Sequence, residues 1–194
     1  YIETKKYYIN ETAFKKLMQN RINKVLIVCS NYDFFMLEED GRIDERIFEE
    51  YVSLNLSHPP LFIHAQTSEC VFNLLKKNDI DLIISTLSVE GIDTFALAKK
   101  IKTEHKNIPF VVLTPFSREV RMRMKREDLS AIDYVFSWLG DTELLLAIIK
   151  LIEDKMNAHN DIEVVGVQAI LLVEDNIRFY SSYLPAMYKI MLQQ

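Results

Sequence analysis

The chain has 194 residues, of which 49% are hydrophobic and 26% are charged. This length suits one domain or one domain with part of another, and this composition excludes a disordered chain. The net charge of −5 argues against a nucleic-acid binder that depends on overall charge, and no apolar run is long enough to span a membrane. Cys29 and Cys70 lie in separate apolar runs, so we expect buried thiols in a cytoplasmic protein.

The first part of the chain, residues 1–23, is expected to form a helical extension. Phe14, Leu17 and Met18 recur at helical spacing, which predicts a short amphipathic helix over 10–22. The run that follows at 24–30 is almost entirely apolar and rich in β-branched residues. This pattern favours a strand that is buried on both faces of a parallel sheet.

Strand and helix patterns then alternate to residue 157. Further strands are predicted at 61–67, 81–87, 109–114 and 133–139. Helices are predicted at 43–56, 68–78, 93–105, 117–128 and 141–157. The alternation predicts an α/β fold with a doubly wound parallel sheet, and its size is that of a flavodoxin-like domain with strand order 2-1-3-4-5. In such a sheet the functional residues gather at the carboxyl ends of the strands.

Three stretches of the sequence resemble the receiver domains of response regulators. They are DLIISTLSVEGIDTFALAKKIK from residue 81, IPFVVLT from residue 108 and AIDYVFSWL from residue 131. Their spacing is similar to that of the CheY-like family across 24–157, with a longer first crossover near 32–42. The resemblance implies a CheY-like five-stranded sheet, to which this chain adds an N-terminal helix and a C-terminal βα extension.

The resemblance also implies where phosphorylation chemistry would lie. A receiver holds Mg²⁺ with two acidic residues after its first strand, accepts a phosphoryl group on an aspartate after the third, and places a lysine after the fifth. Here these positions fall on Cys29 and Ser30, on Thr86, and on Ser137, while Thr114 keeps the Thr/Ser position after the fourth strand. We therefore expect a degenerate phospho-acceptor pocket with no catalytic residue, no metal and no cofactor.

Three alternatives concern single residues near this pocket. Asp33 could replace the missing acids, although loop carboxylates are usually solvated. Thr86 could be phosphorylated by a kinase, although a strand-end hydroxyl more often bonds the backbone. Tyr134 occupies the position of the receiver switch aromatic and would act with Thr114, but packing of an edge by Tyr134 is the simpler interpretation.

The C-terminal part resembles the beginning of a second receiver. Residues 158–168 are polar and are expected to form a linker, and ILLVEDN then matches a first receiver strand. Glu174 and Asp175 take the positions of its acidic pair, so 169–194 is interpreted as the first strand and helix of a truncated second receiver. The alternative is an acidic pair that the helix dipole favours. Four stretches, IDERIFEEYVSLNL, LTPFSREV, DYVFSWLGD and LLVEDNIRFYSSYLP, resemble the N-terminal region of phosphoenolpyruvate synthase or pyruvate phosphate dikinase-like proteins of Bacteroidetes. This resemblance implies enzyme domains downstream.

The expected function is a non-catalytic regulatory module that docks downstream domains of the same chain or dimerises. Helix 141–157 is apolar on two sides and the tail 169–194 carries exposed apolar residues, so both are expected to support self-association. No nucleic-acid partner is expected, because acidic residues dilute the basic helix 117–128. No membrane partner is expected, because no apolar run is long enough to span a membrane. The alternative function is a small-ligand sensor with a hydroxyl-lined strand-end pocket. That pocket would be lined by Ser30, Thr86, Ser88, Thr114 and Ser137.

Overall fold

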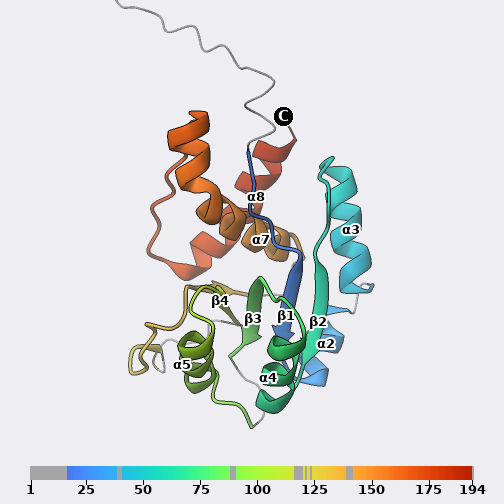
Figure 1. The fold of residues 1–194 in the computed structure, drawn as a ribbon, viewed down its shortest axis with the longest axis vertical. Coiled ribbons are helices and arrows are strands. Elements are labelled where there is room, and N and C mark those ends of the chain that lie inside the picture. Colours follow the sequence, from blue (N-terminus) through green and yellow to red (C-terminus); the bar gives the residue numbers. More distant parts are fainter. Residues whose placement is uncertain are drawn as a thin grey trace, which may run out of the picture.

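The structure, a computed structural model, describes residues 17–38, 41–87, 91–115, 120, 122, 124–138 and 142–193. At its centre lies a five-stranded parallel sheet with the order β2-β1-β3-β4-β5 (Figure 1). The strands are β1 (Lys24–Val28), β2 (Leu61–Ala65), β3 (Leu82–Thr86), β4 (Phe110–Thr114) and β5 (Tyr134–Ser137). The predicted fold class and the predicted strand order are both confirmed.

Several helices begin at residues whose side chains cap them, whereas α3 begins without a side-chain cap. Thr67 accepts a hydrogen bond from the N–H of Cys70 at the start of α4, and Asp93 accepts from Phe95 N–H at the start of α5. The helices are α2 (Asn31–Leu37), α3 (Ile43–Ser53), α4 (Ser68–Lys77), α5 (Thr94–Glu104), α7 (Thr142–Ala158) and α8 (Ile177–Leu192). Helix α2 was not predicted, and it accounts for part of the long first crossover.

Successive residues of β1 enter two separate cores. Val25 and Ile27 pack in the core that includes α3 and α7, whereas Leu26 and Val28 pack in the core that includes α4 and α5. Adjacent side chains of a strand point to opposite faces, so a strand between two helical layers must be apolar at every position. This explains the continuous apolar run at the start of the domain.

The segment before β1 is not helical. The predicted helix over 10–22 is therefore wrong for residues 17–22, and residues 10–16 lie outside the described residues. The amide side chain of Asn157 accepts a 2.8 Å hydrogen bond from Asn20 N–H and donates a 2.7 Å bond to the carbonyl of the same residue. These contacts hold a non-helical backbone, and they outweigh the local helical periodicity.

The chain after α7 differs from the prediction in two places. Helix α7 continues as a π-helix, η1 (His159–Val165), so the predicted linker 158–168 is largely helical. Residues 166–176 form no strand, which contradicts the predicted strand at 169–174. A strand requires a neighbour for its hydrogen bonds, and the segment has none in the described structure. The predicted helix that follows is present as α8, and its interpretation as part of a second receiver stays a prediction.

Helix α8 packs against α7 and β5 of the same chain (Figure 1). Leu184 and Tyr188 of α8 are buried in the core that contains Leu145 and Ile149 of α7. The two apolar sides of α7 are thus covered by the sheet and by α8, without a second molecule. Pro185 lies inside α8, next to this contact.

The predicted basic helix 117–128 falls mainly on residues that are not described. Among its members Val120, Met122 and Met124 are helical, while Arg118, Arg121 and Arg123 lie outside the described residues. In the described part of the chain, no helix combines the length and the apolar character that a membrane crossing needs.

Candidate functional site

The strand ends place most of the predicted pocket residues along one edge of the sheet. Cys29 directly follows β1, and Thr86, Thr114 and Ser137 are the last residues of β3, β4 and β5. Thr114 lies opposite Ser137 in the register of the parallel pair. The site is therefore an edge of small polar side chains, at the place where α/β proteins commonly bind ligands.

The first turn of α2 adds a carboxylate to this edge. The hydroxyl of Ser30 accepts a 3.0 Å hydrogen bond from Asp33 N–H and so caps the helix. The carboxylate of Asp33 in turn accepts a 3.4 Å hydrogen bond from the hydroxyl of Thr86. Asp33 thus reaches the phospho-acceptor position, where its partner is the hydroxyl of Thr86. The alternative that Asp33 replaces the missing acidic residues stays a prediction.

The thiol of Cys29 is fully buried. Burial raises the pKa of Cys29 to about 12, and the nearby carboxylate of Asp33 contributes to this rise in pKa. The thiolate is the reactive and metal-binding form of cysteine, and burial disfavours that form here. The backbone carbonyl of Cys29 lies 3.0 Å from Nε2 of His64, and the ring of Phe34 stacks on that imidazole at 4.1 Å.

His64 was missed by the sequence interpretation. Its position in an otherwise apolar strand next to β1 was the available signal. It supports the backbone of Cys29 from the side, since it contacts the carbonyl and not the thiol. His64 therefore stabilises the backbone at the end of β1.

Ser137 occupies the position at which a receiver carries its lysine. Its backbone N–H donates a 2.8 Å hydrogen bond to the hydroxyl of Ser181, and that hydroxyl donates a 2.6 Å bond to the carbonyl of Ile177. Both serines are buried. Helix α8 therefore covers the end of β5, a contact that the sequence did not predict because no local pattern indicates which surface an amphipathic helix will cover.

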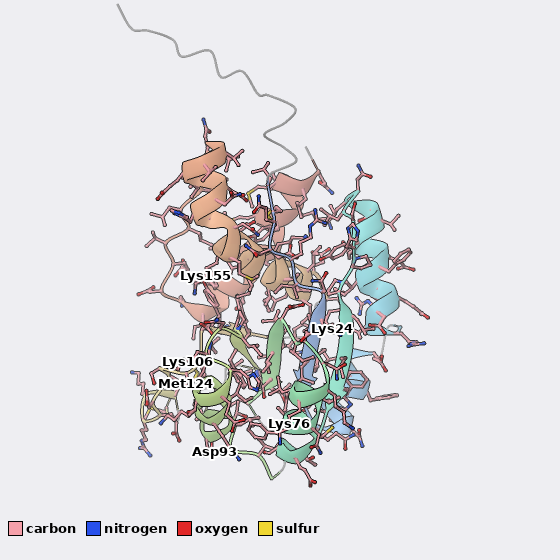
Figure 2. All side chains as sticks on the ribbon, in the orientation of Figure 1. Lys24, Lys76, Asp93, Lys106, Met124 and Lys155 are labelled. Atoms are coloured by element: carbon pink, nitrogen blue, oxygen red, sulfur yellow. The ribbon has the colours of Figure 1, made fainter. Side chains whose placement is uncertain are left out.

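Tyr134 is half-buried at the same outer strand. Its ring stacks on Phe136 at 6.0 Å, and Phe136 stacks on Tyr180 of α8 at 5.4 Å. The ammonium group of Lys155, which is labelled in Figure 2, lies 5.0 Å from the centre of the Tyr134 ring. These contacts are those of a packing residue, and the predicted switch role of Tyr134 with Thr114 stays a prediction.

The predicted acidic pair of the second receiver precedes α8. The carboxylate of Glu174 accepts a 2.9 Å hydrogen bond from Asn176 N–H, and Asn176 caps α8 by accepting from Arg178 N–H. Asp175 is exposed beside them. This local geometry fits the alternative in which the acidic pair supports the start of a helix. Across the described residues, no three His, Cys, Asp or Glu side chains are grouped so that they could hold a metal ion.

A cavity of about 470 Å³ opens beside Ser137. Its remaining lining comes from α7 and from the start of α8. These residues are Leu144, Asn176, Arg178, Phe179, Ser181 and Ser182. The cavity therefore includes Ser137 from the predicted hydroxyl-lined pocket but neither Ser30 nor Thr86, and Ser88 lies outside the described residues.

Comparisons with known proteins agree with the sheet topology. No family model matches the sequence. The heme response regulator HssR from two strains of Staphylococcus epidermidis is 28% identical over 123 residues, which are 62% of this chain and 54% of that protein. The chain thus spans about half the length of these curated relatives.

Two solved structures are similar in fold. A CheY-like response regulator receiver protein from Methanospirillum hungatei JF-1 aligns with a TM-score of 0.52 and 15% identity, covering 71% of this chain and 98% of that one. RcsB from Salmonella enterica serovar Typhimurium aligns with a TM-score of 0.50 and 18% identity, covering 75% of this chain and 67% of that one. The chain therefore has the CheY-like receiver fold.

Proposed function

We propose that this chain is a non-catalytic regulatory module with a receiver fold that aspartyl phosphorylation does not switch. The contact between Thr86 and Asp33 carries the proposal. A threonine hydroxyl cannot form the acyl phosphate that makes receiver phosphorylation labile. In the described part of this edge, a single carboxylate from α2 reaches the phospho-acceptor position, where Mg²⁺ would need several oxygen ligands.

The other strand ends support the same conclusion. Cys29 is buried and its raised pKa keeps the thiol neutral, so it supplies no charge to a metal. Ser137 brings no cation, and its backbone N–H is committed to Ser181. Transfer of a phosphoryl group depends on positive charge that offsets the charge of the transferred group. These side chains supply none.

We infer that the module acts by docking, and that β5 and α7 form the surface on which it holds helix α8. Helix α8 already uses this surface, since Tyr188 donates a hydrogen bond to Asp154 and Lys189 forms a 2.8 Å ion pair with Glu143. The predicted docking of downstream domains and the predicted self-association belong to this proposal. The resemblance of this chain to the N-terminal region of phosphoenolpyruvate synthase-like proteins implies an enzyme domain that the module would regulate, and the full sequence of the gene tests it.

Intact-mass measurement tests whether the chain is unable to accept a phosphoryl group. The chain is incubated with Mg²⁺ and acetyl phosphate beside an active receiver domain as positive control. We expect no gain of about 80 Da, the mass of one phosphoryl group, in the chain while the control gains it. A gain in mass by the wild-type chain would refute the proposal. If the gain disappears in Asp33→Asn, Asp33 accepts the phosphoryl group; if it persists in that variant, another residue does.

The cavity beside Ser137 favours a second candidate function, a small-ligand sensor. Arg178 and the hydroxyls of Ser181 and Ser182 line it together with an apolar wall from Leu144. A panel of metabolites in a thermal-shift assay tests this candidate, with Arg178→Ala as the matched variant. A rise in melting temperature that Arg178→Ala abolishes supports the sensor, and no rise with any compound counts against it.

A further inference from the structure

A cavity of about 460 Å³, here called the amino-end cavity, lies at the edge of the sheet opposite the predicted phospho-acceptor pocket. It is lined by Arg21, which precedes β1, by Ser57, which precedes β2, and by residues of α7 and of the end of α8. Sites that enclose a small molecule commonly measure about 300–1,000 Å³. The amino-end cavity is therefore large enough for a small ligand.

Two buried charges in the amino-end cavity neutralise each other. Glu153 and Lys150 are 3% and 8% exposed, and the ammonium group of Lys150 donates a 2.8 Å hydrogen bond to the Glu153 carboxylate. The other carboxylate oxygen of Glu153 accepts a 3.0 Å hydrogen bond from Ile22 N–H. Buried ions are stable when they are paired and hydrogen-bonded in this way. This ion pair is therefore complete without a ligand.

Arg21 and Asp154 carry the two charges of the lining that this ion pair does not neutralise. The guanidinium of Arg21 donates a 3.4 Å hydrogen bond to the carbonyl of Met18 and lies 3.2 Å from Nδ1 of His58, and no carboxylate among the described residues pairs with it. Asp154 accepts a hydrogen bond from the hydroxyl of Tyr188. Burial raises the pKa of Asp154, and a cationic group bound beside the carboxylate would oppose that rise. The cavity thus offers one positive and one negative charge to a ligand.

An apolar wall completes the amino-end cavity. Met18, Leu56, Met191 and Leu192 line it, and the two leucines also pack against the core. Methionine side chains are flexible and adapt to the shape of a bound group. This wall is therefore suited to an apolar part of a ligand.

The backbone at the amino-end cavity has an unusual conformation. In the part of the chain that the structure describes, three residues other than glycine have a positive φ, and all three belong to this region. Met18 and Asn55, at 50° and 54°, line the cavity, while His58, at 62°, contacts Arg21. The left-handed conformation is unfavourable for residues with a side chain, and such residues cluster at binding sites.

We propose that the amino-end cavity binds a small zwitterion with an apolar side chain, the chemical class of the apolar α-amino acids. The carboxylate of the ligand pairs with Arg21 and its ammonium group pairs with Asp154. Its side chain packs against the apolar wall. This inference adds a binding site to the proposed function, and it depends neither on the phosphorylation result nor on the cavity beside Ser137.

The charges of the lining select a zwitterion over the other classes of ligand. A simple anion would meet the carboxylates of Glu153 and Asp154, and a simple cation would meet Arg21 and the Lys150 ammonium group. An uncharged apolar molecule would remove Arg21 and Asp154 from water without pairing either of them, which is costly. A zwitterion supplies one partner for each charge and adds no net charge to the cavity.

Isothermal titration calorimetry on the 194-residue chain tests the ligand class. The probes are L-valine, L-leucine and L-phenylalanine at neutral pH. Two analogues of L-leucine keep its side chain and one charge each: 3-methylbutylamine lacks the carboxylate, and 4-methylpentanoate lacks the ammonium group. We expect at least one amino acid to bind. We expect both analogues to bind about tenfold or more weakly than L-leucine, because each loses a charge-assisted contact.

Two variants test the assigned contacts. Arg21→Gln changes an exposed side chain, and Asp154→Asn keeps an oxygen that can accept the Tyr188 hydroxyl, so both are compatible with the fold. Each is expected to weaken binding of L-leucine about tenfold or more. Arg21→Gln is also expected to bind L-leucine and 3-methylbutylamine equally, and Asp154→Asn to bind L-leucine and 4-methylpentanoate equally. A purely structural role of these residues would not produce this exchange of preferences.

The matched controls are Arg42→Gln and Asp79→Asn, which remove the same charges at exposed positions outside the cavity. Both are expected to bind L-leucine like the wild type.

Three results would overturn the inference. The first is the absence of binding by all three amino acids at millimolar concentration. The second is an analogue that binds the wild type as tightly as L-leucine does. The third is binding that Arg178→Ala abolishes and Arg21→Gln retains, because the ligand then lies in the cavity beside Ser137. A chain that accepts a phosphoryl group would refute the proposed function and leave this inference intact.

Discussion

The hydroxyl of Ser181 on α8 accepts a 2.8 Å hydrogen bond from the backbone N–H of Ser137 at the end of β5. Because β5 is the last strand of the sheet, there is no further strand whose carbonyl could accept a hydrogen bond from this N–H. Both residues are buried, and they also line the cavity beside Ser137. A side chain of α8 therefore replaces the missing strand at this point of the edge.

Ser181→Ala is expected to lower the free energy of unfolding by about 1–3 kcal/mol, the usual cost of leaving a buried donor without a partner. Ser182→Ala, at the exposed neighbouring position, is the control and is expected to change stability by less than about 0.5 kcal/mol. Urea denaturation measures both. Equal midpoints for the two variants would show that the N–H of Ser137 finds another acceptor when the hydroxyl is removed.

Leu184→Ala tests whether α8 is docked in solution. Leu184 is 3% exposed in the core shared with α7, so truncation is expected to cost about 2–5 kcal/mol. The control is Ile190→Ala on the exposed side of the same helix, for which little change is expected. Thermal and urea denaturation give the comparison. If Leu184→Ala were as stable as its control, α8 would not be part of the cooperative fold.

Three side chains spaced four residues apart hold the segment before β1. Glu153, Asn157 and Asp161 accept hydrogen bonds from the N–H groups of Ile22, Asn20 and Met18, respectively. Asn157→Ala is expected to lower the free energy of unfolding by about 1–3 kcal/mol and to speed amide exchange at Asn20. Asn107→Ala, on an exposed turn, is the control. Unchanged exchange at Asn20 would contradict the role given to Asn157.

The buried thiol of Cys29 predicts a pH dependence. Its pKa is raised to about 12 in the folded chain, against about 8.5 for an ordinary thiol. As the pH rises above the ordinary value, the unfolded chain releases a proton that the folded chain keeps, so stability falls with rising pH. Unfolding free energies of the wild type are therefore expected to decline more steeply between about pH 9 and 11 than those of Cys29→Ala. Parallel declines would mean that the folded thiol ionises normally.

The sheet and its edge could be predicted because their signals are local or topological. A strand buried on both faces must be apolar at each position, as in β1, and this identified the strands directly. The carboxyl ends of parallel strands meet at one edge, so topology alone placed Thr86, Thr114 and Ser137 together. The approach of Asp33 to this edge was among the alternatives, since it lies soon after the first strand, but its contact with Thr86 was not predicted.

The errors lie where distant contacts decide the local structure. Residues 17–22 have a helical spacing of apolar side chains, yet side chains of α7 and η1 bind their backbone in a non-helical form. Residues 169–174 have the composition of a central strand but meet no neighbour in the described structure that could complete a ladder. The packing of α8 on α7 was not predicted for the same reason. The two apolar faces of α7 indicate that other elements pack on them, but they do not indicate which elements.

Pro185 divides α8 into two halves that are held by different contacts. It has no N–H to bond the carbonyl of Ser181 four residues earlier, so the helical ladder is interrupted between the two halves of the helix. The first half is fastened to the sheet through Tyr180, whereas the second is fastened to α7 through Tyr188 and Lys189. The two halves of α8 are therefore joined at the point where the helix lacks a backbone hydrogen bond, and each half has its own anchor on the domain.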